Sequence, residues 1–130
     1  MTVAAWCVLV VLLAPYLLSV AARSAARGAD YVDDPRAYSA TLTGWRRRAH
    51  LAHLNAFEAV PALVAGVMVA ELAHAPRGYV DALALAFVVF RALHAACYIA
   101  DRPVLRSHAW RLGIICVIAL FVVASVHGHG

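Results

Sequence analysis

Four long apolar segments divide this chain of 130 residues. They cover approximately Val3–Ala22, Ala49–Ala73, Tyr79–Ala100 and Val104–Val126. Each is long enough to cross the roughly 30 Å hydrocarbon layer of a membrane as one helix. Because little chain remains outside them, the sequence predicts an all-α membrane protein. We expect a single four-transmembrane-helix domain over residues 1–130, with up-down topology.

The positions of the basic residues predict how these segments cross the membrane. All eleven are arginine, and most of them lie in the first and third connections, whereas the second contains only Arg77. Positive residues accumulate on the cytoplasmic side of membranes. We therefore expect those two connections in the cytoplasm and both termini outside, in a bacterial inner membrane. The net charge of +4 comes from these membrane flanks, so no nucleic-acid partner is expected.

Polar residues interrupt the second apolar segment along one helical face. Arg48, Leu51, Asn55, Glu58 and Ala62 recur at the spacing of such a face. At the helical rise per residue, Glu58 lies about 15 Å beyond Arg48, near the middle of the hydrocarbon layer. A charge at this depth costs about 2.5–3.5 kcal/mol on insertion scales, which makes Glu58 a candidate functional residue.

A second polar stripe follows the inner half of the third segment. It consists of Arg91, His94, Tyr98 and Arg102. Arg91 is about 16 Å from Arg102 along a helix, and so lies at the depth of Glu58. A buried Glu58–Arg91 ion pair would lower the insertion cost of both side chains, and we expect one.

The fourth segment begins with another polar cluster, composed of Arg106, Ser107, His108 and Arg111. Together with the two polar stripes, it predicts one cavity in the cytoplasmic half of the bundle. This cavity is rich in arginine and poor in carboxylate, which favours an anionic ligand. Arginine binds carboxylates through paired hydrogen bonds, and the helix start at Ser107 adds amides that favour anions. The same positive field would stabilise a thiolate, so a thiol-bearing ligand is a candidate.

These residues form a pattern that resembles the MAPEG family, the membrane-associated proteins of eicosanoid and glutathione metabolism. The pattern is Arg48-Ala-x-x-x-x-x-Asn55-x-x-Glu58-x-x-Pro61, then Arg91-x-x-His94-x-x-x-Tyr98, then Arg106-Ser107. The resemblance covers essentially the whole chain and suggests a bacterial-type member. It implies a homotrimer that holds glutathione, its co-substrate, at subunit interfaces. The implied activity is that of a membrane-embedded glutathione transferase or peroxidase acting on apolar electrophiles or lipid hydroperoxides.

The resemblance also implies roles for individual residues. Arg106 and Ser107 are implied to stabilise the thiolate. The candidates for binding glutathione are Arg48, Asn55, Glu58, Arg91, His94 and Tyr98. Glutathione-using eukaryotic members have an arginine four residues before the Asn; Leu51 fills this position here, and Arg48 is the candidate replacement. The histidines lack a ligand spacing, so no metal is expected.

Structural roles compete with these functional ones. Asn55 could hold two helices together, Glu58 and Arg91 could be a structural pair, and Tyr98 could be an interfacial aromatic residue. Two other function classes also stay open, a non-catalytic membrane scaffold and a small four-span transporter. Glutathione binding separates the enzyme from both. Besides itself, the enzyme would contact membrane lipids and a small apolar substrate.

Overall fold

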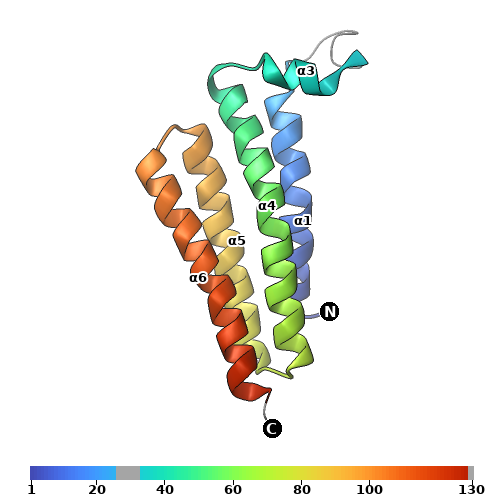
Figure 1. The fold of residues 1–130 in the computed structure, drawn as a ribbon, viewed down its shortest axis with the longest axis vertical. Helices are drawn as coiled ribbons and strands as arrows, with labels where there is room; N and C mark the ends of the chain where they lie inside the picture. The colour runs from blue at the N-terminus through green and yellow to red at the C-terminus, as the bar shows by residue number, and fades with distance from the viewer. Residues whose placement is uncertain (26–32, 129–130) are drawn as a thin grey trace.

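The protein is a bundle of four long helices, seen in a computed structural model that describes residues 1–25 and 33–128 (Figure 1). The long helices are α1 Val3–Ala22, α4 Gly44–Leu72, α5 Arg77–Ile99 and α6 Pro103–His127. All four have the length and hydropathy needed to cross a membrane. The predicted all-α, four-span fold is therefore confirmed. The second helix begins at Gly44, ahead of its apolar run, so the arginines that flank the membrane are helical too.

The helices run up and down, and the first and last helices bring the two ends of the chain to the same end of the bundle (Figure 1). The most extensive contacts join α5 to α6 and α1 to α4. The short helix α3, Pro35–Ala40, lies at the opposite end (Figure 1). There the buried side chains of Ala22, Leu42 and Ala49 pack together with Tyr38 of α3. This small cluster packs α3 and Leu42 against the bundle.

Two tight turns connect the later helices, and neither uses glycine at its left-handed position. His74 after α4 and Asp101 after α5 have φ angles of 53° and 57°. At the end of α5, the Arg102 N–H donates to the Cys97 carbonyl at 2.9 Å, the long bond of a Schellman motif. This closure lets α6 start at Pro103 with almost no loop. The polar stripe of α5 consequently lies beside the polar start of α6.

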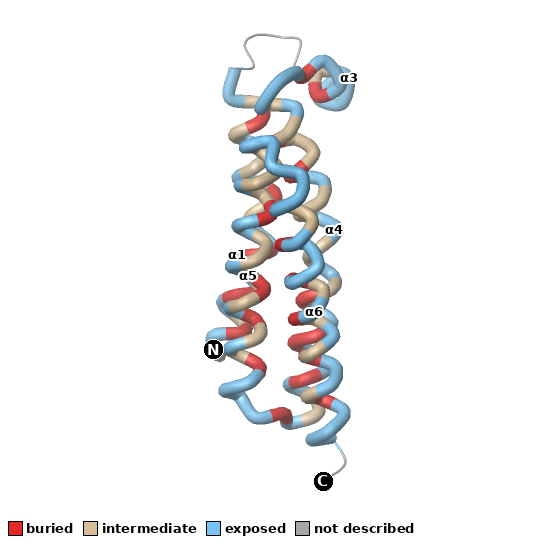
Figure 2. Tube along the Cα trace, turned by 90° about the vertical axis from the view of Figure 1, so that its left-hand side faces the viewer, coloured by how far each residue is buried: buried red, intermediate tan, exposed pale blue. Residues whose placement is uncertain are grey.

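The apolar core lies mainly towards the end that carries the termini, where buried stretches recur along the helices (Figure 2). Leu63, Phe87 and Leu120 are almost completely buried. Gly66 permits close packing of α4 on α6, because a Cβ atom there would lie 3.0 Å from Leu120 Cδ1. The two polar stripes and the polar start of α6 lie in the other half of the bundle.

One histidine of the polar half joins α1 to α4. His53 is buried, and its Nδ1 lies 2.7 Å from the carbonyl oxygen of Pro15. A carbonyl only accepts, so Nδ1 carries the hydrogen. The His53 ring also packs edge-on against Phe57. His53 is thus engaged in holding the bundle together.

Candidate functional site

Asn55 is the centre of a polar network between α4 and α5. Arg91 Nη2 donates to Asn55 Oδ1 at 2.7 Å and to the backbone oxygen of Asn55 at 3.1 Å. On its other side, Asn55 Nδ2 donates to Glu58 Oε2 at 3.3 Å. Residues 55 and 58 are one helical turn apart on α4, so both side chains reach the same part of α5. The amide of Asn55 therefore connects a guanidinium to a carboxylate.

The direct ion pair that the sequence predicted between Glu58 and Arg91 is wrong. In the part of the chain that the structure describes, Glu58 and Arg91 make no direct ion pair, and Asn55 lies between them. Matching depth brought the two charges to one level, but the rotation of α5 aims Arg91 at Asn55 instead. Arg91 is half-buried, whereas Glu58 is exposed. The carboxylate thus keeps capacity to bind another group.

Two adjoining cavities surround this network. The first, called here the deep chamber, has a volume of about 140 Å³ and is lined by Asn55, Glu58, Ala59, Ala62, Phe87, Arg91, Trp110, Gly113 and Ile114. The second, called the arginine chamber, has a volume of about 330 Å³ and is lined by Asn55, His94, Tyr98, Arg106, Ser107, Trp110 and Arg111. Because Asn55 and Trp110 line both chambers, the two cavities lie side by side.

Aromatic contacts organise the wall of the arginine chamber. The guanidinium carbon of Arg106 lies 4.5 Å from the centre of the Tyr98 ring, a cation–π distance. The His94 ring packs edge-on against the same tyrosine, with centroids 5.6 Å apart. His94 is only 3% exposed, and its buried Nδ1 has no hydrogen-bond partner. A buried polar nitrogen without a partner is rare in folded proteins, which usually pair such groups.

The family of the chain follows from its match to a family model. The model described as the MAPEG family matches residues 3–126, nearly the whole sequence. This chain belongs to the MAPEG family. Searches among curated proteins and among solved structures give no significant match. Membership identifies an integral, multi-pass membrane protein related to glutathione and eicosanoid metabolism.

Most of the predicted site residues of this MAPEG protein lie together. Asn55, Glu58 and Arg91 line the deep chamber, and Asn55, His94, Tyr98, Arg106 and Ser107 line the arginine chamber. They come from α4, α5 and α6, the three helices from which the sequence predicted one cavity. The hydroxyl of Ser107 donates to the Pro103 carbonyl at 2.9 Å, within its own helix. It must rotate away from that carbonyl before it can donate to a ligand.

Arg48 lies apart from the chambers of the MAPEG protein. Its Nε donates to the carbonyl oxygen of Ile99 at 2.9 Å. Ile99 is the last residue of α5, where carbonyls lack helical donors. Arg48 therefore caps the C-terminal end of α5. Neither Arg48 nor Leu51 lines either chamber. The candidate replacement for the missing arginine thus has a structural bond.

The structure adds Trp110, to which the sequence assigned no role, and brings Arg111 of the predicted polar cluster into the chamber wall. Both are exposed on α6, and both line the arginine chamber. Their spacing from Ser107, three and four residues, was the available signal, because it places all three on one side of a helix. No group of three or more His, Cys, Asp or Glu side chains is placed to hold a metal among residues 1–25 and 33–128.

Proposed function

We propose that this MAPEG protein binds glutathione across its two chambers and uses the thiolate against an apolar electrophile or a lipid hydroperoxide. The observation that carries the proposal is the charge of the adjoining chambers. Their walls contain three guanidiniums, of Arg91, Arg106 and Arg111, and one carboxylate, of Glu58, a net charge of +2. Glutathione carries two carboxylates and an ammonium, and ionisation of its thiol brings the net charge to −2. The chambers therefore match the thiolate form.

Each chamber suits a different part of this ligand. The exposed carboxylate of Glu58 in the deep chamber is a partner for the ammonium and can retain its bond from Asn55 Nδ2. The arginine chamber has no carboxylate in its wall and suits the anionic groups. Guanidinium–carboxylate pairs are short and charge-assisted, so such a ligand would be held in one orientation.

Arg106 and Ser107 are the residues proposed to activate the thiol. A free thiol has a pKa near 8.5, so only a few per cent is ionised at neutral pH. A fixed guanidinium at the start of α6 would favour the thiolate, and about 1.4 kcal/mol would increase its ratio to the thiol tenfold. The stacking of Arg106 on Tyr98 restrains this charge before the ligand arrives. The thiol proton would pass to water at the cytoplasmic opening.

The thiolate then reacts in one of two ways. With an electrophile, its electron pair forms a carbon–sulfur bond and the leaving group departs with the bonding pair. With a hydroperoxide, the sulfur attacks the terminal oxygen and the oxygen–oxygen bond breaks. The alkoxide released takes a proton from water, leaving an alcohol and glutathione sulfenic acid. Both co-substrates are apolar enough to arrive from the membrane.

The proposal includes a homotrimer, because the site is open on one side. Glu58, Trp110 and Arg111 are all exposed in the single chain. Neighbouring subunits would cover this open side and exclude water from the thiolate. Native mass spectrometry from mild detergent should find three copies. A stable monomer that still binds glutathione would remove the intersubunit site from the proposal.

A thiolate absorbance titration tests the function directly. Glutathione added to the detergent-purified protein should produce saturable thiolate absorbance at neutral pH, whereas S-methylglutathione, which has no ionisable thiol, should produce none. Binding without thiolate absorbance would favour a non-catalytic binding protein. If calorimetry also detected no binding, the enzyme hypothesis would give way to the scaffold or transporter.

A further inference from the structure

Arg111 is the one charged side chain of the arginine chamber whose role is not yet accounted for. It lies eight residues into α6 from Pro103, about 12 Å along the helix axis. Arg91 lies eight residues before the end of α5 at Ile99, again about 12 Å. The backbones of the two arginines thus lie equally far from that end of their helices.

These two guanidiniums differ in their partners. Arg91 makes two hydrogen bonds to Asn55. Arg111 is exposed, and within residues 1–25 and 33–128 the structure gives it no hydrogen bond or ion pair. An arginine inside a membrane segment usually pairs with another group, faces a cavity or extends to the interface. Since Arg111 lines the arginine chamber, a ligand anion is the natural partner.

The neighbouring residues indicate which anion this is. Arg106 stacks on Tyr98 beside Ser107, and this pair is already proposed to hold the thiolate. Glu58 in the deep chamber suits the ammonium of the γ-glutamyl end. The γ-glutamyl carboxylate is on the same carbon as this ammonium, so it would lie in the same chamber, whose wall contains Arg91. The anionic group left for the arginine chamber is the carboxylate at the other end of the tripeptide.

We propose that Arg111 binds the glycyl carboxylate of glutathione. The inference rests on the proposed function and deepens it, because it requires the thiol substrate to carry a carboxylate on the side opposite its ammonium. Arg48 is not available for this role in the present arrangement, since its Nε bonds to the end of α5.

Glutathione and its glycyl monoethyl ester separate this role from a general need for positive charge. The ester keeps the thiol and the γ-glutamyl end but loses the carboxylate in question. In the full-length protein, calorimetry should show that glutathione binds about tenfold or more tightly than the ester, as a charge-assisted pair would give. In Arg111→Gln this preference should fall below about threefold, because the partner of the carboxylate is gone.

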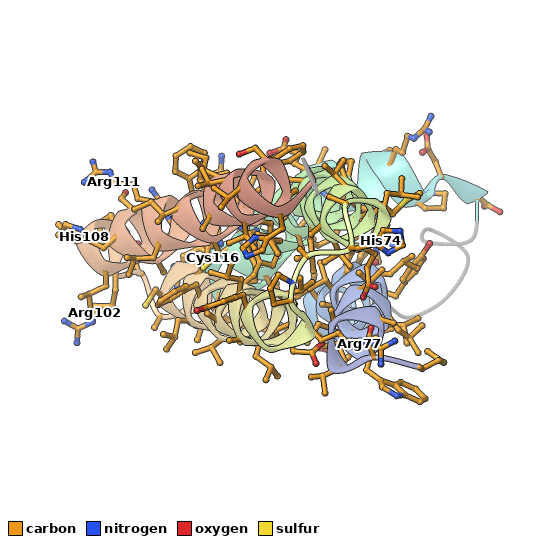
Figure 3. The ribbon with its side chains drawn as sticks, turned by 90° about the horizontal axis from the view of Figure 1, so that it is seen from below. His74, Arg77, Arg102, His108, Arg111 and Cys116 are labelled. Atoms are coloured by element: carbon orange, nitrogen blue, oxygen red, sulfur yellow. The ribbon has the colours of Figure 1, made fainter. Side chains whose placement is uncertain are left out.

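Arg102→Gln is the matched control. Arg102 and Arg111 both lie on the left-hand side of the molecule in Figure 3 and point in different directions, and Arg102 lines neither chamber. The control should keep the wild-type preference for glutathione over the ester. Arg111→Lys keeps the charge but not the paired hydrogen bonds, so its preference should be intermediate.

The possible outcomes are distinct. If Arg111→Gln keeps the full preference, the inference is wrong and Arg111 is a membrane-interface anchor. Should Arg111→Gln fail to fold, an undiminished preference in Arg111→Lys would overturn the inference as well. If the wild-type protein binds neither ligand, the proposed function itself fails and the inference falls with it.

Discussion

Arg91 Nη2 and Asn55 Oδ1 lie 2.7 Å apart, and this contact joins the middle of α5 to the middle of α4. The same amide donates to Glu58, so Asn55 is hydrogen-bonded to both charged residues, Arg91 and Glu58. Arg91 also forms part of the deep-chamber wall. Loss of this one amide would therefore affect both the packing of the two helices and the shape of the proposed site.

The first prediction is that Arg91 is coupled more strongly to Asn55 than to Glu58. In a double-mutant cycle, Asn55→Ala and Arg91→Leu should be non-additive by about 1 kcal/mol, in the range of interhelical hydrogen bonds in membranes. Glu58→Gln and Arg91→Leu should show weaker coupling, because no direct bond joins them. Unfolding in mixed detergent and SDS measures both cycles. Stronger coupling in the second cycle would contradict this prediction and indicate a direct ion pair between Glu58 and Arg91.

The second prediction is that Arg106→Leu impairs thiolate formation more than glutathione binding. The substitution removes the positive charge stacked on Tyr98 and should raise the pKa of the bound thiol. The thiolate titration and calorimetry measure the two effects separately. If binding is abolished while the thiol pKa is unchanged, Arg106 is a carboxylate clamp and another group activates the sulfur.

Ser107→Ala provides the graded comparison for this prediction. The Ser107 hydroxyl donates to the Pro103 carbonyl at 2.9 Å in the free protein, so donation to sulfur would cost an existing bond. We therefore expect Ser107→Ala to change the thiol pKa in the same direction as Arg106→Leu but by less. An effect equal to that of Arg106→Leu would make the hydroxyl an equal contributor.

The third prediction concerns the end of the bundle that carries the termini. The carboxylate of Asp81 on α5 accepts a hydrogen bond from the Ala4 N–H at 2.7 Å, in the first turn of α1. It acts as a helix cap from a neighbouring helix and favours the positive end of the helix dipole. Asp81→Ala should lower the free energy of unfolding by about 1 kcal/mol.

Glu71→Ala is the control for the cap. Glu71 accepts a longer, exposed bond of 3.3 Å from the Thr2 hydroxyl. Its removal should cost clearly less than the removal of Asp81, because a solvated bond contributes little. Equal losses in thermal unfolding would show that general surface charge, and not the cap on α1, accounts for the stability.

The fourth prediction is that both termini face the outside of the cell. The helix α3 and the arginine-rich start of α4 lie at the end of the bundle opposite the termini (Figure 1), and positive residues favour the cytoplasm. A C-terminal reporter that works only in the cytoplasm should therefore be silent, and one that works only outside should be active. If the cytoplasmic reporter were active and the outside reporter silent, the termini would be cytoplasmic and the chambers would lie in the outer half of the membrane.

The helices and the depth of their polar residues were determined by the sequence alone. Runs of apolar residues specify membrane spans because an unpaired backbone is not tolerated in lipid. The rise per residue then placed Glu58 and Arg91 at one level, and the face periodicity placed Asn55 beside Glu58. The family pattern in these residues was likewise legible, and the family match confirms it.

The partners of the long polar side chains were decided only by the tertiary structure. Asn55 separates Glu58 from Arg91, Arg48 closes the end of α5, and Arg111 faces the arginine chamber. Periodicity specifies where a residue lies on its own helix, but not how far the neighbouring helix is rotated. An arginine side chain can also reach several acceptors from one position, and the packing of the helices around it selects among them.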